Sequence, residues 1–530
     1  MEPTTATTGQ TETGEPTGSG NGAAPGVAET FEVHRPTDGS VIETLEVASP
    51  ERVREVVARV RAAQPEWEAM GVKGRQRWLA RWRDWLLENR DRITDIVQEE
   101  TGKVRGDSGL ESVYLEMAAN FWGENAARYL ADETPAPGML PTKVRRLRVR
   151  YRPYPVVGII SPWNFPLILS AGDAIPALMA GAAVVIKPSE FTPLELMEVV
   201  RGWKEEVGGP DVFDVVNGMG ETGGALVDEV DYMHFTGSAR TGRVVMKRAA
   251  DTLTPVSLEL GGKDPAIVLA DADIERAVNA TTYGGFVNTG QVCMSIERVY
   301  VEEPIYDEFV AKLATKVGEL RQGADGREYG MEQGAMTSPN QIEIVSDHVE
   351  DARAKGARVL TGGKRKDGPG HWYEATVIAD ADHSMKVMVD ETFGPVVGVM
   401  KVADEAEAVR MANDTRYGLS ASVFAGDVKR AEKVAERLEV GAANINDALV
   451  NYFHLEVPMG GWKESGIGWR HGPTGIRKYC RTETIVAPRL PTQKNEPLWY
   501  PYTPRRRKLL NRLYRALNAR GLRNRLGIGK

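Results

Sequence analysis

The chain has very few cysteines: its 530 residues include only Cys293 and Cys480. Two cysteines so far apart cannot build a disulfide framework, which suits the reducing cytoplasm. Histidine is also scarce, and no CxxC pair or His/Cys cluster occurs, so the sequence predicts no metal site. No apolar run is long enough to span a bilayer. The N-terminus lacks the charged start and apolar stretch of a secretory signal, so we expect a cytoplasmic protein.

Acidic residues are missing from the C-terminal end, although they outnumber basic ones in the whole chain. From Leu498 to Lys530 there are ten Lys and Arg and no Asp or Glu, whereas the chain has a net charge of −8. Subtracting the ten charges of this tail leaves −18 for residues 1–497. A body this acidic is unsuited to nucleic acid, so we expect no nucleic-acid partner.

Large apolar residues are nearly missing from the first 28 residues, which are mostly Thr, Gly, Glu, Pro and Ala. Such a segment cannot bury enough surface to offset its ordering entropy, so we predict that residues 1–28 are disordered. The chain as a whole is 42% hydrophobic and 26% charged, as in soluble globular proteins. It is too long for a single hydrophobic core, so we expect at least two domains.

Short apolar runs alternate with helical patterns through most of the chain. Near the start, Ser49 and Pro50 predict the beginning of a helix, and a second amphipathic stretch covers residues 78–97. Residues 145–151 are typical of an edge or hairpin strand. Runs typical of strands buried on both faces are 156–160, 183–186, 213–216 and 266–269, and the alternation resumes after Cys293. The pattern predicts an α/β fold with two doubly wound domains and the chemistry in the cleft between them.

Cys293 lies in the polar, glycine-containing stretch Asn288–Ser295. A structural cysteine is normally surrounded by core residues, whereas a nucleophilic one needs a partly open, polar setting that holds a thiolate. The loop by itself therefore favours a nucleophile and an inert thiol equally.

Polar turns follow the predicted strands, and open parallel sheets bind ligands at the carboxyl ends of their strands. The first turn, Ser161–Pro166, holds Asn164 between two prolines, where its amide either donates a fixed hydrogen bond or merely caps the turn. The second contains Lys187 and Glu190, which either bind the hydroxyls of a ribose or form a solvated ion pair. Taken alone, this pair favours the solvated ion pair.

Two further turns contain glycine. Gly237 and Ser238 precede a helix and could present backbone N–H groups to a phosphate, although the segment is neither G-x-G-x-x-G nor a P-loop. Glu259 alternates with apolar residues just before Gly261 and Gly262. A carboxylate in such a place suits a general base, although many such acids are simply surface charges.

Together and in this order, the motifs resemble those of the NAD(P)-dependent aldehyde dehydrogenase superfamily from about Phe31 to Pro488. The resemblance implies that Cys293 is the nucleophile, Asn164 the oxyanion asparagine and Glu259 the general base, which leaves Cys480 a structural role. It also implies the following cofactor-binding residues: Trp163, Lys187, Glu190, Gly237, Ser238, Gly261, Glu391 and Phe393.

The mechanism that the resemblance implies is covalent. The Cys293 thiolate attacks an aldehyde, the nicotinamide cofactor is reduced, and water activated by Glu259 hydrolyses the thioester to a carboxylic acid. Relatives that transfer the acyl group to coenzyme A generally lack this glutamate, so hydrolysis is favoured. Glu190 favours NAD because it would repel a 2′-phosphate, while NADP use stays open.

A homodimer or homotetramer formed through a β-strand arm is also implied. On this basis the chain divides into an NAD-binding domain of residues 29–144 and 162–261, a catalytic domain of residues 262–480, an oligomerisation arm of residues 145–161 and 481–492, and a basic amphipathic tail of residues 493–530.

The substrate is less well defined. Well-described succinate-semialdehyde dehydrogenases bind the substrate carboxylate with two arginines, and the aligned residues here are Gly172 and Val287. The segments around Cys293–Val301 and Arg470–Pro473 nevertheless resemble actinobacterial sequences labelled succinate-semialdehyde dehydrogenase. We expect a medium-to-large or aromatic aldehyde, with succinate semialdehyde as the alternative. Arg470 stands where some relatives have a second acidic residue, which puts a proton relay at that position in doubt.

The basic tail contains one apolar helical face, formed by Leu509, Leu510, Leu513, Tyr514 and Leu517. Such a helix either lies on an anionic membrane surface or docks on an acidic face of its own or a neighbouring subunit, and the second is slightly favoured. A different class of function, an enzyme-derived structural or membrane-surface scaffold, predicts loss of Cys293, Glu259 or Asn164. All three residues are present.

Overall fold

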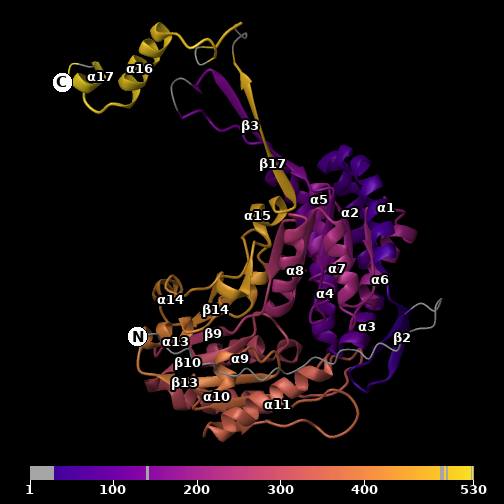
Figure 1. The fold of residues 1–530 in the computed structure, drawn as a ribbon. Helices are drawn as coiled ribbons and strands as arrows, with labels where there is room; N and C mark the ends of the chain where they lie inside the picture. The colour runs from indigo at the N-terminus through magenta and orange to yellow at the C-terminus, as the bar shows by residue number, and fades with distance from the viewer. Residues whose placement is uncertain (1–28, 139–141, 490–493, 497–498, 527, 529–530) are drawn as a thin grey trace, which may run out of the picture.

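Two open α/β sheets and a projecting two-stranded arm make up the computed structural model, which describes residues 29–138, 142–489, 494–496, 499–526 and 528 (Figure 1). The two sheets, each built mainly of parallel strands, confirm the predicted fold class. A small hairpin of β1 (Thr30–His34) and β2 (Val41–Glu46) precedes them. The prediction of disorder for residues 1–28 lies outside the described residues.

The first sheet has six strands in the order β16-β8-β7-β4-β5-β6, parallel except for β16. Every residue of β5 and β7 is buried, which explains why residues 183–186 of β5 form a continuous apolar run. Its strands are β4 (Val156–Ile160), β5 (Ala183–Lys187), β6 (Phe213–Val215), β7 (Tyr232–Thr236), β8 (Val256–Glu259) and β16 (Gly466–Ile467).

Helices before and between these strands cover the first sheet. Helix α1 (Pro50–Ala69) starts where predicted, because the Ser49 hydroxyl accepts a hydrogen bond from the backbone N–H of Arg52. The predicted stretch 78–97 is instead two helices that meet at Asn89, whose side chain donates to the carbonyl of Trp85. These and the later helices are α2 (Gly71–Glu88), α3 (Arg90–Thr101), α4 (Arg105–Tyr129), α5 (Ala171–Ala180), α6 (Leu194–Arg201), α7 (Gly220–Glu229) and α8 (Ala239–Asp251).

The second sheet has seven strands in the order β11-β12-β13-β10-β9-β14-β15, with only β11 antiparallel to its neighbour. Its strands are β9 (Asp264–Val268), β10 (Ile296–Glu302), β11 (Arg358–Thr361), β12 (Thr376–Ala379), β13 (Val396–Val402), β14 (Ser420–Phe424) and β15 (Ala442–Ile445). The accompanying helices are α9 (Ile274–Phe286), α10 (Tyr306–Gly318), α11 (Pro339–Ala354), α12 (Lys386–Val389), α13 (Glu405–Asn413) and α14 (Val428–Ala435). Helix α15 (Gly472–Arg477) instead packs on α4 and α5 beside the first sheet.

One continuous apolar core joins the two sheets. Buried Leu258 and Leu260 at the end of β8 belong to the same cluster as Val292 and Met294, and Cys293 packs against that cluster. The predicted nucleophile therefore lies at the junction of the two sheets.

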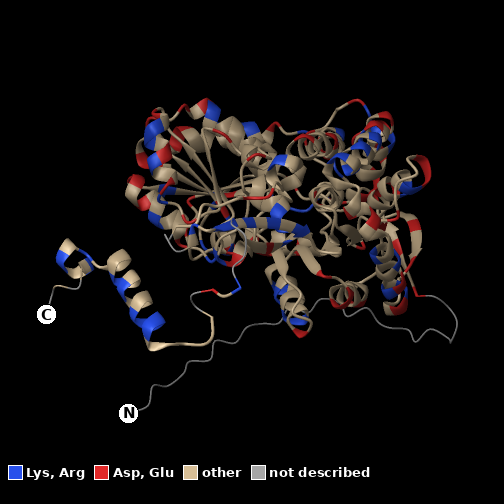
Figure 2. Cartoon of the chain, turned by 90° about the horizontal axis from the view of Figure 1, so that it is seen from above, with Lys and Arg blue, Asp and Glu red and all other residues tan. Residues whose placement is uncertain are grey.

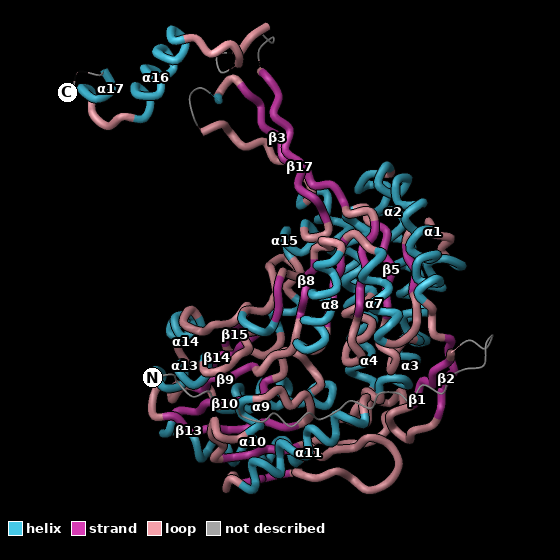
Figure 3. The backbone as a smooth tube through the Cα atoms, viewed as in Figure 1, coloured by secondary structure: helices cyan, strands magenta, loops and turns pink. Residues whose placement is uncertain are grey.

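The arm consists of β3 (Arg145–Pro153) and β17 (Cys480–Pro488), paired antiparallel along their whole length. It projects from the body (Figures 1 and 3). Residues 156–160, which the sequence analysis assigns to the arm, instead form β4 in the middle of the first sheet, between β5 and β7. Their uninterrupted burial, unlike the alternating exposure of β3, is the physical reason for this correction.

Beyond the arm the chain forms α16 (Pro504–Asn518) and α17 (Leu522–Leu526), which stand apart from the body (Figures 1 and 2). No side chain of either helix is buried among the described residues. None of the helices in the described ranges has the length and apolarity needed to cross a membrane.

Candidate active site

Cys293 lies on a tight loop between α9 and β10. The loop contains Asn288 and Thr289 in the left-handed backbone region, with φ of 51° and 56°. Gly290 follows with φ of 71°, and a side chain there would come within 2.1 Å of the carbonyl oxygen of Gly394. The loop is thus packed tightly against the segment that carries Glu391 and Phe393.

The side chain of Cys293 opens into a pocket lined by segments that accompany the first sheet and by segments that accompany the second. Every lining residue besides Cys293 is aliphatic, aromatic or Met: Leu110, Phe165, Ile168, Leu169, Tyr283, Val287, Val292, Met294, Leu449, Tyr452 and Phe453. Within the described ranges no charged side chain lines this pocket, so it favours apolar ligands.

The Cys293 thiol is half-buried, and its surroundings differ from those expected of a ready thiolate. Burial, together with the nearby carboxyl groups of Asp264 and Glu391, raises its pKa to about 12. The polar residues of the loop that suggested a thiolate setting are occupied with backbone contacts, whereas the thiol faces an apolar pocket. Cys293 is therefore a neutral thiol in this state.

This raised pKa predicts how Cys293 reacts with iodoacetamide when nucleotide is absent. Only the thiolate is alkylated, so the rate should rise about tenfold per pH unit from pH 7 to 10 without reaching a plateau. Inactivation rates measured on a Cys480→Ala background, which leaves Cys293 as the single thiol, check this. A plateau near pH 8 would contradict it.

Asn164 is held beside the cysteine loop. Its buried side-chain amide donates to the backbone carbonyl of Gln291 at 3.0 Å, two residues before Cys293. The side chain of Asn288 donates in turn to the backbone carbonyl of Asn164 at 2.8 Å. One N–H of the Asn164 amide is thus used to fix the group, and the second is left for a ligand.

Glu259 is the last residue of β8, and its backbone is fixed between β7 and β16. Its buried carboxylate forms an ion pair with the guanidinium of Arg470. Within the described part of the chain, no hydrogen bond or ion pair joins this carboxylate to Cys293. No motif in the sequence predicts the pairing with Arg470.

The predicted nucleotide residues of the first sheet lie at the carboxyl ends of its parallel strands. Lys187 ends β5 and contacts Glu190 at 3.3 Å, and burial lowers the pKa of the lysine. Gly237 follows β7, and Ser238 caps α8 by accepting from the backbone N–H of Thr241 at 3.2 Å. This edge and the N-terminus of α8 suit the ribose and phosphates of a dinucleotide.

Trp163, Gly261, Glu391 and Phe393 gather nearer to Cys293. The rings of Trp163 and Phe393 meet edge to face with centroids 5.5 Å apart. The Glu391 carboxyl accepts from the backbone N–H of Gly262 at 3.0 Å, and a side chain at Gly261 would come within 2.1 Å of it. Burial and neighbouring Glu297 raise the pKa of Glu391 to about 8. Glycine is thus required where this carboxyl approaches the backbone.

Glu297 is a supporting residue that the sequence analysis missed. Its carboxylate accepts from the backbone N–H groups of Thr392 and Phe393, both at 2.8 Å, and pairs with buried Lys263. It therefore fixes the segment that presents Glu391 and Phe393. An acidic residue near the start of the buried strand β10 is the signal that could have found it.

Comparison with known proteins decides the family. The model described as aldehyde dehydrogenase family matches residues 24–485. The chain belongs to the aldehyde dehydrogenase family. It is accordingly an oxidoreductase that acts on aldehydes.

Relatives of this aldehyde dehydrogenase span nearly its full length. A Mycolicibacterium smegmatis protein provisionally named succinate-semialdehyde dehydrogenase (NADP+) is 41% identical, covering 85% of this chain and 87% of its own. The 4,4′-diapolycopene aldehyde oxidase of a Methylomonas species is 40% identical, covering 88% and 87%. Among solved structures, an aldehyde dehydrogenase from Brucella melitensis is 35% identical with a TM-score of 0.82, covering 87% of this chain and 94% of that chain.

Proposed function

We propose that this aldehyde dehydrogenase oxidises an apolar aldehyde to the carboxylic acid through a covalent adduct on Cys293. The main support is that the Cys293 thiol opens into the apolar pocket and that Asn164 is held beside the cysteine loop. NAD(P), when bound, supplies the two-electron acceptor for the oxidation.

In the first half of the reaction, the Cys293 sulfur bonds to the aldehyde carbon, and the carbonyl oxygen becomes an oxyanion. The free N–H of the Asn164 amide and the backbone N–H of Cys293 stabilise that oxyanion. Because the thiol is neutral beforehand, its proton passes to solvent water as the sulfur bonds to the aldehyde carbon. The product of this half is a thioester on Cys293.

In the second half, the Glu259 carboxylate takes a proton from water, which attacks the thioester carbon and releases the acid and the Cys293 thiol. Glu259 is buried at the end of β8, close in sequence to Gly262, where a side chain would contact the Cys293 carbonyl at 2.4 Å. A rotation of the Glu259 side chain away from Arg470 is needed for this step.

The pocket favours a medium-to-large or aromatic aldehyde over succinate semialdehyde. Val287, where carboxylate-binding relatives have an arginine, lines the pocket, and Gly172 instead packs under the ring of Tyr114. A substrate carboxylate would be buried there without a cation, which costs binding energy. The relative named 4,4′-diapolycopene aldehyde oxidase favours the same substrate class, whereas the names of the mycobacterial relatives favour the alternative.

An aldehyde panel tests this proposal. We expect octanal, decanal and benzaldehyde to be oxidised with kcat/KM at least about 100-fold above that of succinate semialdehyde. Val287→Arg is the matched variant and should move the preference toward succinate semialdehyde. Preference of the wild type for succinate semialdehyde contradicts the substrate assignment, and no turnover of any aldehyde favours the scaffold alternative.

NAD is the preferred nucleotide in this proposal. The Glu190 carboxylate, next to buried Lys187, would bond the ribose 2′-OH and repel a 2′-phosphate. Measuring kcat/KM for both nucleotides with the best aldehyde tests this, and a higher value for NADP, as the name of the 41% identical relative suggests, would contradict it.

The arm supports a homodimer or homotetramer. Alternate residues of β17 are exposed, and Val144 and Val486, both near the tip of the arm, expose 47% and 58% of their surface. An exposed pair of strands with apolar residues favours pairing with another copy of the chain. Light scattering of the purified protein determines which of the two states forms.

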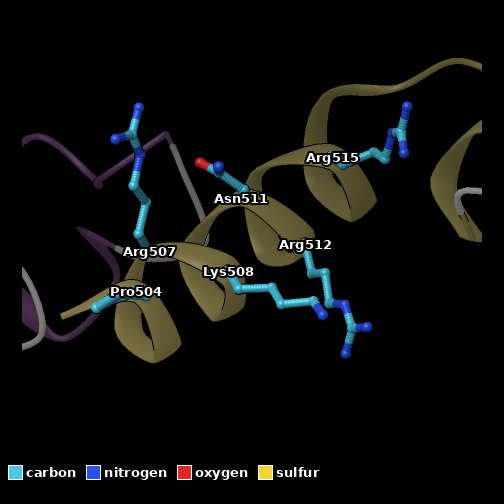
Figure 4. A pocket seen from close by; sticks show the side chains of 6 residues that line it. All are labelled: Pro504, Arg507, Lys508, Asn511, Arg512 and Arg515. Atoms are coloured by element: carbon cyan, nitrogen blue, oxygen red, sulfur yellow. The ribbon is translucent and has the colours of Figure 1, made fainter.

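The tail supports peripheral contact of a cytoplasmic enzyme with an anionic membrane surface. Arg507, Lys508, Arg512 and Arg515 extend away from α16 (Figure 4). No described acidic residue pairs with these four, and Leu509 on the same helix is 69% exposed. A basic helix with uncovered apolar residues is typical of interfacial binding, and it would place an enzyme for apolar aldehydes at their source.

Co-sedimentation with vesicles tests the membrane contact. The full-length protein should bind vesicles containing phosphatidylglycerol at least about tenfold better than a form truncated after Pro497, because each basic residue contributes about 1 kcal/mol. Pure phosphatidylcholine vesicles are the control. Equal binding of both forms rejects the membrane, and a change of oligomeric state on truncation indicates docking on a neighbouring subunit instead.

A further inference from the structure

Arg470 is a buried cation that bridges two carboxylates at the edge of the active site. Its guanidinium donates to both carboxylate oxygens of Asp173 on α5, at 2.9 and 2.7 Å, and to the hydroxyl of Thr236 at the end of β7, at 2.9 Å. The remaining nitrogen forms the ion pair with Glu259. The side chain of Arg470 is 5% exposed, so water does not screen these contacts.

The other titratable groups around Arg470 are mostly neutral near pH 7. Burial, with Lys478, lowers the pKa of His234 to about 4, and burial, with Arg470, lowers that of His471 to about 3. Burial lowers the pKa of Lys478 to about 7. Arg470 is therefore the one permanent cation in this cluster of described residues, shared between Asp173 and Glu259.

The two carboxylates differ in what they can do. Asp173 is fixed, because it contacts His234 at 3.1 Å and because both of its carboxylate oxygens accept hydrogen bonds from Arg470. Glu259 has a backbone fixed by β7 and β16, but Arg470 is the sole described partner of its carboxylate. Its side chain can therefore move while the rest of the cluster stays in place.

We propose that Arg470 is a positioning residue that holds the Glu259 carboxylate in the ion pair, so that release of Glu259 from Arg470 controls the hydrolysis step. This inference rests on the proposed role of Glu259 as general base. It assigns Arg470 no contact with substrate or nucleotide. Acylation of Cys293, which does not use Glu259, is independent of Arg470.

The proposal predicts opposite changes of the hydrolysis rate when Arg470 is replaced and when Asp173 is replaced. In Arg470→Gln, Glu259 loses a neighbouring cation that favours its ionised form. The acid limb, which is the fall of the hydrolysis rate toward low pH, should therefore move up by about 1 to 3 pH units. At pH values above the acid limb, hydrolysis should be a few-fold faster than in the wild type because Arg470 no longer holds the Glu259 carboxylate. In Asp173→Asn, Arg470 binds Glu259 more tightly, and hydrolysis should be a few-fold slower.

Rapid mixing of enzyme, NAD and aldehyde from pH 6 to 10 separates the two steps. The initial burst of NADH reports acylation and should stay within about twofold of wild type in both variants, while the subsequent steady rate reports hydrolysis. Arg470→Lys keeps a cation and should leave the acid limb near its wild-type position, which keeps the test valid if Arg470→Gln does not fold.

Two outcomes would overturn the inference. One is an equal loss of burst and steady rates in the Arg470 and Asp173 variants with an unchanged acid limb, as a purely structural role predicts. The other is faster or unchanged hydrolysis in Asp173→Asn. Failure of the proposed function is distinguishable, because it would show as normal hydrolysis in Glu259→Gln, whatever the Arg470 variants do.

Discussion

Replacing Cys293 by alanine is expected to lower kcat for aldehyde oxidation by at least about 10⁴-fold. The substituted methyl group cannot bond to the aldehyde carbon, so neither the adduct nor the thioester forms. Nucleotide affinity should change less than about twofold, because Lys187, Glu190 and Ser238 lie on the first sheet and make no contact with the thiol. Steady-state assays and nucleotide titration by fluorescence measure the two effects.

The matched control for this substitution is Cys480→Ala. Cys480 is also a buried thiol with a pKa raised by burial to about 12, but it begins β17 on the arm and does not line the pocket. Activity of this variant should stay within about twofold of wild type. A Cys293→Ala enzyme that keeps more than about one hundredth of wild-type turnover would show that the reaction proceeds without a covalent adduct.

Replacing Glu259 by glutamine is expected to separate the two halves of the reaction. Glutamine has nearly the same shape but cannot take a proton from water, so hydrolysis of the thioester should slow by about 10²- to 10⁴-fold. The first turnover should remain, giving a burst of about one NADH per active site followed by a very slow steady rate. Rapid-mixing absorbance at the NADH band measures both phases.

Asp264→Asn provides the control for removing a buried acid near the cysteine. Asp264 is buried at the start of β9, where it has no role in the proposed reaction, and burial raises the pKa of its carboxyl well above the usual range. Its hydrolysis rate should stay near that of the wild type. An unchanged steady rate in Glu259→Gln, or loss of its burst, would remove Glu259 from the role of general base.

Much of the fold follows from local sequence. Ser49 and Pro50 predict the first residues of α1 because capping depends on neighbouring residues alone. The buried strands β4 and β5 read as apolar runs because both of their faces are covered. Local patterns did not show where the arm ends and the first sheet begins. Strand β3 of the arm ends at Pro153, and the buried strand β4 of the first sheet begins three residues later.

The candidate nucleotide residues and Cys293 could be named from the sequence because each occupies a short motif whose spacing is set by one strand and its following turn. Glu297 was not named, because its function depends on backbone N–H groups of a segment that only the folded chain brings to it. The neutral thiol could not be predicted either, since its pKa depends on burial and on carboxyl groups from two other segments.

The sequence by itself determined the family and the α/β fold class, and it named the candidate site residues, since these depend on local periodicity and on motifs. The tertiary structure alone decided that the Cys293 thiol faces an uncharged pocket and that Glu259, the proposed general base, is paired with Arg470. The physical reason is that burial and ion pairing are properties of neighbours in space. Glu259 ends β8 and Arg470 follows β16, which pairs with β8, and nothing in either local sequence specifies their contact.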